Sequence, residues 1–252
     1  MRILILGGTG EAVELANQLA ERRHKVTTSL AGRTNNPHRP KGKLQVGGFG
    51  GAEGLAKFLA DNHFDYLIDA THPFAAQISA HAVAAGKAAK VPLLRLERAP
   101  WPEPEKAGWV HVKDEEEAAR ALPVSATVLL TIGRQHLGPF VKRADCRFIL
   151  RSIEAPEREP PENFVLHPER PPFTKPAELA LMRRFGISHL VAKNSGGEQT
   201  AAKLDAAFFL KVKVVMINRP GLPPAQTVAT VEETLEVVDH LPTPARRFTF
   251  LP

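Results

Sequence analysis

The sequence predicts an α/β protein built from two domains, each with a parallel sheet covered by helices. Apolar runs of strand length alternate with stretches of helical spacing along most of the chain, the pattern that places helices on both faces of a parallel sheet. A proline-rich stretch at Glu97–Gly108 interrupts this alternation. The length of 252 residues suits two domains of about 120 residues each.

The first half begins with the clearest strand. Arg2–Leu6 is a short apolar run that ends in glycines, which is typical of a strand buried on both faces, and apolar residues recur at helical spacing from Ala12 to Ala20. Further strands are expected at Lys25–Ala31, Tyr66–Ala70 and Val91–Leu96, with a weak one around 44–46. Helices are expected at Ala52–Asn62 and Ala75–Lys90.

The stretch Glu97–Gly108 carries three prolines among charged residues, so it suits an extended linker. The sequence therefore predicts an N-terminal domain at 1–100 and a C-terminal domain at 107–252. Strands of the second domain are expected at Trp109–Val112, Thr127–Ile132, Phe148–Ile153, His189–Ala192 and Val212–Ile217. Its helices are expected at Asp114–Leu122, Pro176–Phe185, Thr200–Leu210 and Val231–His240, and a loop with six prolines at Pro156–Pro172.

Composition and charge argue against several classes of protein. No apolar run approaches the roughly 18 residues that span a bilayer, and the apolar start is too short for a signal peptide. The net charge of +6 favours an anionic partner, but only 6% of residues are aromatic and no basic helix carries interleaved aromatics, which argues against nucleic acid. The single cysteine, Cys146, can form neither an internal disulfide nor a cysteine-based metal cluster. We expect a cytoplasmic protein that uses no metal and binds no membrane.

The turn Gly7–Ala12 lies where the first strand hands over to a helix. Glycines there let backbone N–H groups approach a phosphate, and the helix dipole adds attraction; Val13 departs from the fingerprint G-x-G-x-x-G, and a merely structural turn is the alternative. Thr9 can cap the helix or donate to a phosphate. Glu11 suits the dipole but repels a diphosphate, so we expect it to face a sugar hydroxyl or the substrate. The candidate cofactor residues are Gly7, Gly8, Thr9 and Gly10.

The end of the second strand lies where the adenosine ribose of a dinucleotide is normally held. NAD enzymes commonly place an acid here, whereas NADP enzymes accommodate the 2′-phosphate with an arginine. The charged residue in this chain is Arg33, with more basic residues following it, so the sequence favours NADPH over NADH; a solvated basic loop is the alternative. The candidate cofactor residues are Ala31, Gly32, Arg33 and Thr34.

Two further turns follow strands of the first half, Gly47–Gly51 and Asp69–Phe74. Ligands of open α/β sheets bind beyond the carboxyl ends of the strands, so both turns are expected to line the site, with Gly48 and Thr71 toward the cofactor. His72 is a candidate proton carrier or anion contact, and a structural histidine is the alternative.

The second half repeats the order of strand, small or polar turn and helix at Thr131–Arg134 and Lys193–Gly197. Two such turns predict a second anion-binding edge that faces the first across a cleft, with Arg134 and Lys193 as its charges. For each of them, a surface base near a turn is the alternative.

Together these segments resemble the precorrin-6A reductases of cobalamin biosynthesis. The resemblance extends over nearly the whole chain in consistent order, and Thr71–Ala75 and Lys193–Gly197 are its most specific parts. The segments are Gly7–Thr9 with Glu11, Ala31–Arg33, Gly47–Gly50, Asp69–Ala75, and Ala192–Asn194 with Gly196–Gly197.

The resemblance implies an oxidoreductase acting on a CH–CH group, which reduces one double bond of precorrin-6A, or of its cobalt form, to precorrin-6B with NADPH. It implies two Rossmann-like domains with the active site in the cleft between them, and it is compatible with transient contact with neighbouring pathway enzymes. The substrate is then a polycarboxylate tetrapyrrole, which requires basic contacts, and His72 is the candidate catalytic acid. The candidate substrate residues are Glu11, His72, Arg134, Arg151, Lys193, Asn194, Ser195 and Gly196.

Two other functions stay open at this point. Two α/β domains with glycine turns also describe glycosyltransferases that use a nucleotide sugar, and a regulator that senses a dinucleotide without catalysis. Arg33 disfavours the nucleotide sugar weakly. The specific segments in both halves disfavour the sensor.

Overall fold

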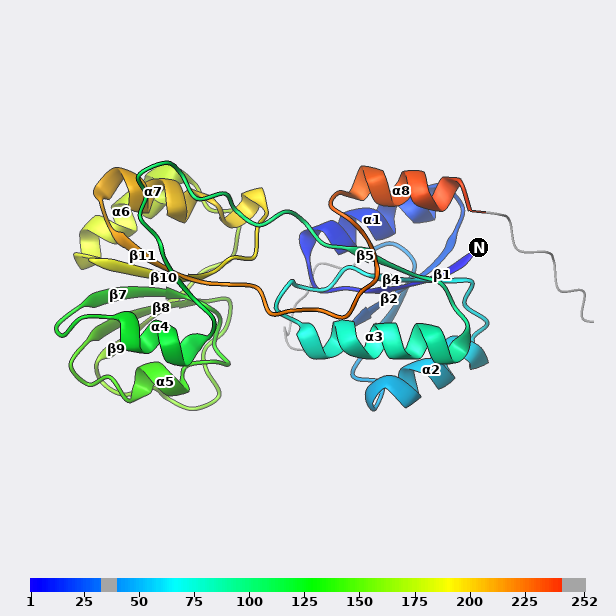
Figure 1. Ribbon diagram of the computed structural model, residues 1–252, viewed down its shortest axis with the longest axis horizontal. Helices are drawn as coiled ribbons and strands as arrows, with labels where there is room; N and C mark the ends of the chain where they lie inside the picture. Colours follow the sequence, from blue (N-terminus) through cyan, green and yellow to red (C-terminus); the bar gives the residue numbers. More distant parts are fainter. Residues whose placement is uncertain (33–39, 242–252) are drawn as a thin grey trace, which may run out of the picture. The chain divides into compact units, whose positions relative to one another are not determined.

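The computed structural model describes residues 1–32 and 40–241 (Figure 1). The chain divides into two compact units, of which the first consists of Met1–Arg98 and the segment that begins at Gly221, and the second of Ala99–Pro220. Each unit contains one six-stranded sheet. All ten strand pairs among the described residues are parallel. The predicted α/β class with two parallel sheets is therefore confirmed.

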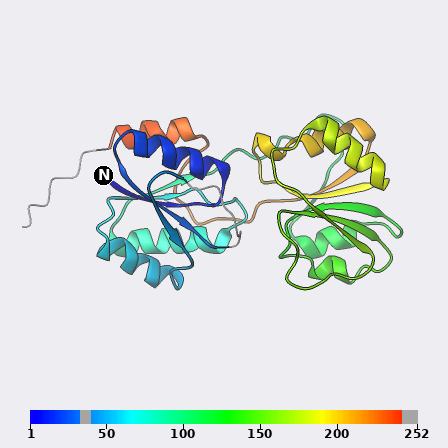
Figure 2. The same ribbon diagram turned by 180° about the vertical axis from the view of Figure 1, so that it is seen from behind.

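The first sheet has the strand order β12-β5-β4-β1-β2-β3. Its strands are β1 (Arg2–Leu6), β2 (Lys25–Leu30), β3 (Lys43–Val46), β4 (Tyr66–Asp69), β5 (Leu93–Leu96) and β12 (Gln226–Val228). Helices α1 (Gly10–Glu21) and α8 (Val231–Asp239) cover one face, and α2 (Gly51–Asp61) and α3 (Ala76–Ala89) cover the other (Figures 1 and 2). The central strand β1 is buried on both faces, as its apolar run predicts, because Ile5 packs under α1 while Leu4 packs under α2 and α3.

The end of the chain differs from the prediction. The sequence predicts that 107–252 forms the second domain, whereas the segment after Gly221 returns to the first unit. There β12 pairs with β5, and α8 packs Val231 and Leu235 into the core beneath α1. The prediction is wrong here because helical spacing shows that α8 has an apolar face but not which sheet that face covers. Strand β12 attaches this segment to the first sheet, but with three residues it is too short for a recognisable sequence pattern.

The second sheet has the strand order β6-β11-β10-β7-β8-β9. Its strands are β6 (Val110–Val112), β7 (Thr127–Thr131), β8 (Arg147–Ser152), β9 (Phe164–Pro168), β10 (His189–Lys193) and β11 (Lys213–Ile217). Helices α6 (Lys175–Phe185) and α7 (Ala202–Leu210) cover one face, and α4 (Glu115–Ala121) and α5 (Gly138–Val141) lie on the other (Figure 1). Within the described part of the chain, no helix has the length and apolar character needed to cross a bilayer.

Strand β9 lies inside the stretch Pro156–Pro172 that the sequence predicts as a loop. Phe164 of β9 packs against Phe148 of β8 with ring centroids 4.7 Å apart, which holds the strand at the sheet edge. Pro168 ends the strand, a position where a missing backbone N–H costs no hydrogen bond of the ladder. The prolines therefore mark an edge strand and the segments beside it.

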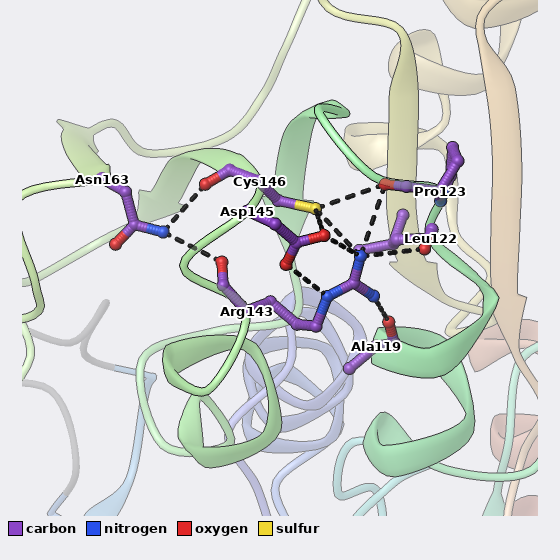
Figure 3. A network of polar contacts seen from close by, with 7 residues as sticks. All are labelled: Ala119, Leu122, Pro123, Arg143, Asp145, Cys146 and Asn163. Atoms are coloured by element: carbon purple, nitrogen blue, oxygen red, sulfur yellow. Dashed lines mark hydrogen bonds and ion pairs between the residues drawn. The ribbon is translucent and has the colours of Figure 1, made fainter.

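A polar network closes the end of α4 (Figure 3). The guanidinium of Arg143 pairs with Asp145 at 2.7 Å and donates to the carbonyl oxygens of Ala119 and Leu122. The last carbonyls of a helix have no partner within the helix, so Arg143 acts as the C-terminal cap of α4. Cys146 is buried in this network, and burial raises the pKa of its thiol.

The predicted linker is tied to the second unit. The backbone N–H of Trp101 donates to Asn194 Oδ1 at 2.8 Å, and its indole N–H donates to the carbonyl oxygen of Gly197 at 2.9 Å. Two residues further on, Glu103 Oε2 lies 2.9 Å from His111 Nε2 at the middle of β6. The proline-rich segment 99–108, called the strap below, is therefore bound to the second unit and is not a free linker.

Replacing His111 with glutamine is expected to reduce stability over a limited pH range. Hydrogen bonds with Glu103 and with Asn218 raise the pKa of His111, and the hydrogen bonds from His111 and from the Trp109 N–H lower the pKa of Glu103. The stability from the charged pair is fully present between the ordinary pKa values of 4.5 and 6.5. It is lost as pH rises through the raised pKa of His111 and as pH falls through the lowered pKa of Glu103.

The measurement is the urea midpoint of unfolding for wild type and His111→Gln across a series of pH values. His81→Gln, on α3 of the first unit, serves as the control because it removes a histidine and leaves the Glu103 pair intact. A loss of stability in His111→Gln that is equal at every pH would contradict the expected titration.

Candidate active site

One edge of the first sheet collects the turns that the sequence analysis singled out. Because β1, β2, β3 and β4 are parallel, their carboxyl ends meet at this edge. The candidate cofactor residues found there are Gly7, Gly8, Thr9, Gly10, Ala31, Gly32, Gly48 and Thr71. Arg33 and Thr34, which are predicted to contact a 2′-phosphate, lie outside the described residues.

The turn Gly7–Gly10 connects β1 to α1 and requires its glycines. Gly8 has a φ of +119°, a conformation that glycine adopts at little cost. A Cβ on Gly7 would lie 3.0 Å from Thr28 Cγ2, so this position needs a small residue. The result is a tight turn that presents the backbone N–H groups of the first turn of α1, together with the positive end of the helix dipole.

Thr9 is the N-cap of α1 and also connects two turns of the site. Its Oγ1 accepts from the Ala12 N–H at 3.1 Å, the usual capping bond, and donates to the carbonyl oxygen of Ala70 at 2.9 Å. Because the single hydroxyl hydrogen is used on Ala70, Thr9 acts here as a cap and as a link between β1 and β4. A phosphate at this helix end would therefore meet backbone N–H groups.

Glu11 is clamped by an arginine that the sequence analysis missed. Arg98 Nη1 donates to both carboxylate oxygens of Glu11, at 2.9 and 2.7 Å. The pair is partly exposed and carries no net charge, which removes the repulsion that Glu11 alone would exert on an anion at the start of α1. Arg98 was not predicted as a site residue because it lies in the segment predicted as a linker. Its position just after β5, at the carboxyl edge of the sheet, could have indicated a site residue.

A narrow cleft lies between the Gly7–Gly10 turn and the turn after β4. Its volume of about 10 Å³ leaves room for roughly one water molecule. It is lined by Thr9, Glu11, Thr71, Pro73, Leu96 and Arg98. The structure therefore brings Glu11 and Thr71, which are far apart in sequence, to one place.

The turn after β4 is held by side-chain hydrogen bonds. Asp69 is buried, and its Oδ1 accepts from the Thr71 N–H at 3.2 Å and the Thr71 hydroxyl at 2.7 Å. In the next step of the turn, the Phe74 N–H donates to His72 Nδ1 at 3.3 Å. Nδ1 therefore offers a lone pair, and a neutral His72 ring carries its hydrogen on Nε2. His72 stands half-buried at the carboxyl edge of the sheet.

In the second unit, the predicted basic residues already have carboxylate partners. Lys193 Nζ lies 2.8 Å from Glu115 Oε1, and Arg134 Nη2 lies 3.3 Å from Glu154 Oε2. Lys193 is the last residue of β10 and Arg134 follows the parallel strand β7, so both lie at the carboxyl edge of the second sheet. A carboxylate ligand would have to compete with these glutamates.

Arg151 has an internal partner. Its side chain is 4% exposed and forms an ion pair with Glu178, which is 1% exposed, and its guanidinium lies 3.9 Å from the ring centroid of Phe173. Such a side chain packs the segment around Phe173 onto β8. It reaches an anion outside the protein only by leaving a buried carboxylate uncompensated, which is unfavourable.

Lys193 affects the pKa of Glu115. Burial raises the pKa of Glu115, but the hydrogen bond and the positive charge of Lys193 outweigh burial, and the net effect lowers the pKa. His136 Nδ1 lies 3.7 Å from the same Glu115 Oε1. Glu115, which the sequence analysis did not select, therefore places a carboxylate beside both Lys193 and His136.

The residues after Lys193 hold the strap described above. The carbonyl oxygen of Asn194 accepts from Arg219 Nε at 2.8 Å, while its side chain binds Trp101. A Cβ on Gly196 would lie 2.0 Å from the carbonyl oxygen of Ala99, so only glycine fits. Asn194 and Gly196 are thus engaged within the unit, and Ser195 is buried between them.

Comparison with known proteins identifies the family. A family model described as precorrin-6x reductase CbiJ/CobK matches residues 2–239. A precorrin-6A reductase from Rhodococcus erythropolis is 44% identical over 98% of this chain and 99% of that protein. A precorrin-6A reductase from Rhodobacter capsulatus is 42% identical over 96% and 98%, and a cobalt-precorrin-6A reductase from Priestia megaterium is 27% identical over 94% and 97%.

A solved structure agrees with these sequences. The structure described as CobK precorrin-6A reductase has a TM-score of 0.91 and 42% sequence identity, and the match covers 97% of this chain and 98% of that one. The two parallel sheets and the order of their elements are therefore shared with that enzyme. This chain belongs to the precorrin-6x reductase CbiJ/CobK family.

Proposed function

We propose that the protein reduces one double bond of the precorrin-6A macrocycle with NADPH and thereby forms precorrin-6B. Its family makes it a precorrin-6A reductase, an oxidoreductase of cobalamin biosynthesis; the reductant and the product are the proposed steps. The observation that carries the proposal is the glycine turn at the start of α1, on the carboxyl edge of a parallel sheet, in a chain similar throughout to such reductases.

The residues at this edge fit a dinucleotide. Gly8 has a positive φ, and the N–H groups of the first turn of α1 can hold a diphosphate. The Glu11–Arg98 pair places no unopposed negative charge there. Ala31, Gly32, Arg33 and Thr34 would hold the adenosine ribose with its 2′-phosphate, and Gly48 and Thr71 would line the cofactor. Bound NADPH would supply the hydride.

His72 is the proposed proton donor. As an acid it must carry hydrogen on both ring nitrogens, so its Nδ1 has to give up the 3.3 Å contact with the Phe74 N–H. A neutral His72 would instead donate a hydrogen bond from Nε2 to a substrate oxygen. Glutamine distinguishes the two roles. Its side-chain amide can donate a hydrogen bond, so it can replace a neutral His72, but it cannot transfer a proton, so it cannot replace an acid.

Arg134 and Lys193 are the proposed contacts for the carboxylates of the tetrapyrrole. Arginine binds carboxylates through a planar fork, and lysine provides a point charge. In binding, the substrate would take the place of Glu154 and Glu115 on these cations. Asn194, Ser195 and Gly196 would act by holding Lys193 in position, since their own groups bind the strap and Arg219.

The metal-free macrocycle is the proposed natural form of the substrate. The relatives from Rhodococcus and Rhodobacter, named for precorrin-6A, share 44% and 42% of residues with this chain, whereas the one from Priestia, named for the cobalt form, shares 27%. The proposed location is the cytoplasm, which the single buried cysteine supports.

The test is incubation of the protein with NADPH and precorrin-6A, in metal-free and cobalt forms, while the absorbance of NADPH and of the macrocycle is followed. Loss of NADPH coupled to a change in the macrocycle spectrum is expected, faster with the metal-free form. Consumption of neither reactant would overturn the proposal, and faster reaction of the cobalt form would overturn the assignment of the natural substrate.

Arg33→Ala is expected to weaken NADPH binding by about tenfold or more, because it removes a charge-assisted contact with the 2′-phosphate. NADH, which lacks this phosphate, should bind wild type and variant nearly equally. The measurement is a titration of nucleotide fluorescence. Lys57→Ala, which removes an exposed cation near the far end of α2, is the control, and equal losses for both nucleotides would refute the role of Arg33.

His72→Ala is expected to lower kcat by about a hundredfold or more if His72 is the acid, with NADPH affinity unchanged. His72→Gln should then be equally slow, because glutamine cannot transfer a proton. Steady-state kinetics with precorrin-6A, beside a fluorescence titration of NADPH, provide the measurement. Nearly normal kcat with a raised KM would leave His72 only a binding role.

A further inference from the structure

A buried ion pair lies directly beneath the turn that carries Thr71 and His72. Asp69 ends β4 and Arg95 lies opposite it in β5, with Arg95 Nε 3.5 Å from Asp69 Oδ2 and side chains 7% and 1% exposed. Both project toward the face covered by α2 and α3, as their alternation with Ile68 and Leu94 requires. Neither Asp69 nor Arg95 has a direct role in the proposed reaction.

This pair is poorly suited to a purely stabilising role. The contact is long, and Arg95 Nη2 is buried with no hydrogen-bond partner among the described residues. Removing two charges from water is costly, and a buried ion pair is often no more stable than apolar residues of similar size. A buried pair with a long contact and an unpartnered nitrogen, next to a candidate ligand site, points to a role other than stability.

The contacts of the pair show what that role is. Asp69 Oδ1 receives the Thr71 N–H and hydroxyl, so it fixes the first step of the turn. Arg95 faces the other carboxylate oxygen, and its Nη1 donates to the carbonyl oxygen of Pro223 at 3.0 Å. Pro223 lies in the segment that returns to the first unit after Gly221. The arginine thus connects the turn after β4 to this returning segment.

We propose that Arg95 is a positioning residue, which acts through Asp69 to hold Thr71 and His72 where they meet cofactor and substrate. Without the guanidinium, Asp69 is a buried carboxylate with no cation beside it, which is unfavourable, and movement toward water relieves that cost. Such a movement disturbs the two bonds that fix Thr71. The meeting with cofactor and substrate rests on the proposed function; the fixing of the turn does not.

The decisive variants separate charge balance from packing. Arg95→Met keeps an apolar stem of similar length and leaves Asp69 unpaired. The double variant Asp69→Asn with Arg95→Met removes both charges but keeps an amide oxygen that can accept from Thr71. Arg143→Met is the matched control. It removes an arginine that pairs with a carboxylate, Asp145, in the network of Figure 3, and this network lies in the second unit, far in sequence from the turn after β4.

The first readout needs no ligand. Hydrogen exchange of the Thr71 backbone amide, followed by NMR in the intact protein, is expected to be about tenfold faster in Arg95→Met and close to wild type in the double variant. Arg143→Met should leave it unchanged. Wild-type exchange in Arg95→Met, or equal acceleration in Arg143→Met, would overturn the positioning role.

The second readout is functional. In Arg95→Met we expect an NADPH dissociation constant about tenfold higher and a kcat about tenfold lower, since a displacement of about 1 Å can cost this much or more; the double variant should recover most of both. Wild-type values in Arg95→Met, at a temperature where it is folded, would refute the link to function. If wild type itself fails to bind NADPH, the proposed function fails, and the exchange measurement still decides the fixing of the turn.

Discussion

Both sheets are parallel throughout their described strands, and this constraint determines where the candidate residues lie. Parallel strands need crossover helices, so both faces of each sheet are covered and the strand interiors are apolar. Polar side chains can then gather only where the strands end. Four turns of the first unit meet at one such edge, and Arg134 and Lys193 lie at the corresponding edge of the second.

Four pairs of opposite charge lie at or just beneath these edges in the part of the chain that the structure describes. The pairs are Glu11–Arg98, Asp69–Arg95, Glu154–Arg134 and Glu115–Lys193. Among the residues 1–32 and 40–241, these four cations therefore each face a carboxylate before any anion binds. Binding of a diphosphate or a polycarboxylate must draw on backbone N–H groups and on exchange of partners, which favours ligands with several well-placed negative groups over simple ions.

The helices and strands that could be predicted from the sequence are those with long and regular apolar patterns. The apolar run of β1 and the spacing in α1 were long enough to read correctly. Strands β9 and β12 were not, because the first is bounded by prolines and the second has three residues. The glycine turns could be predicted because their residue types are distinctive within a few positions. The roles of Arg95 and Arg98 could not, because they depend on Asp69 and Glu11, which lie far away in the sequence.

The missing third glycine of the fingerprint has a structural explanation. That glycine normally allows the helix to pack closely on the sheet, and Val13, which occupies its place, is only half-buried here. The residue that faces the sheet is Ala12, which is fully buried in the core with Ile3 and Ile5. The small contact residue has therefore moved one position toward the N-terminus. A small side chain thus still lies between the start of α1 and the sheet, beside the turn Gly7–Gly10 where an anion site is proposed.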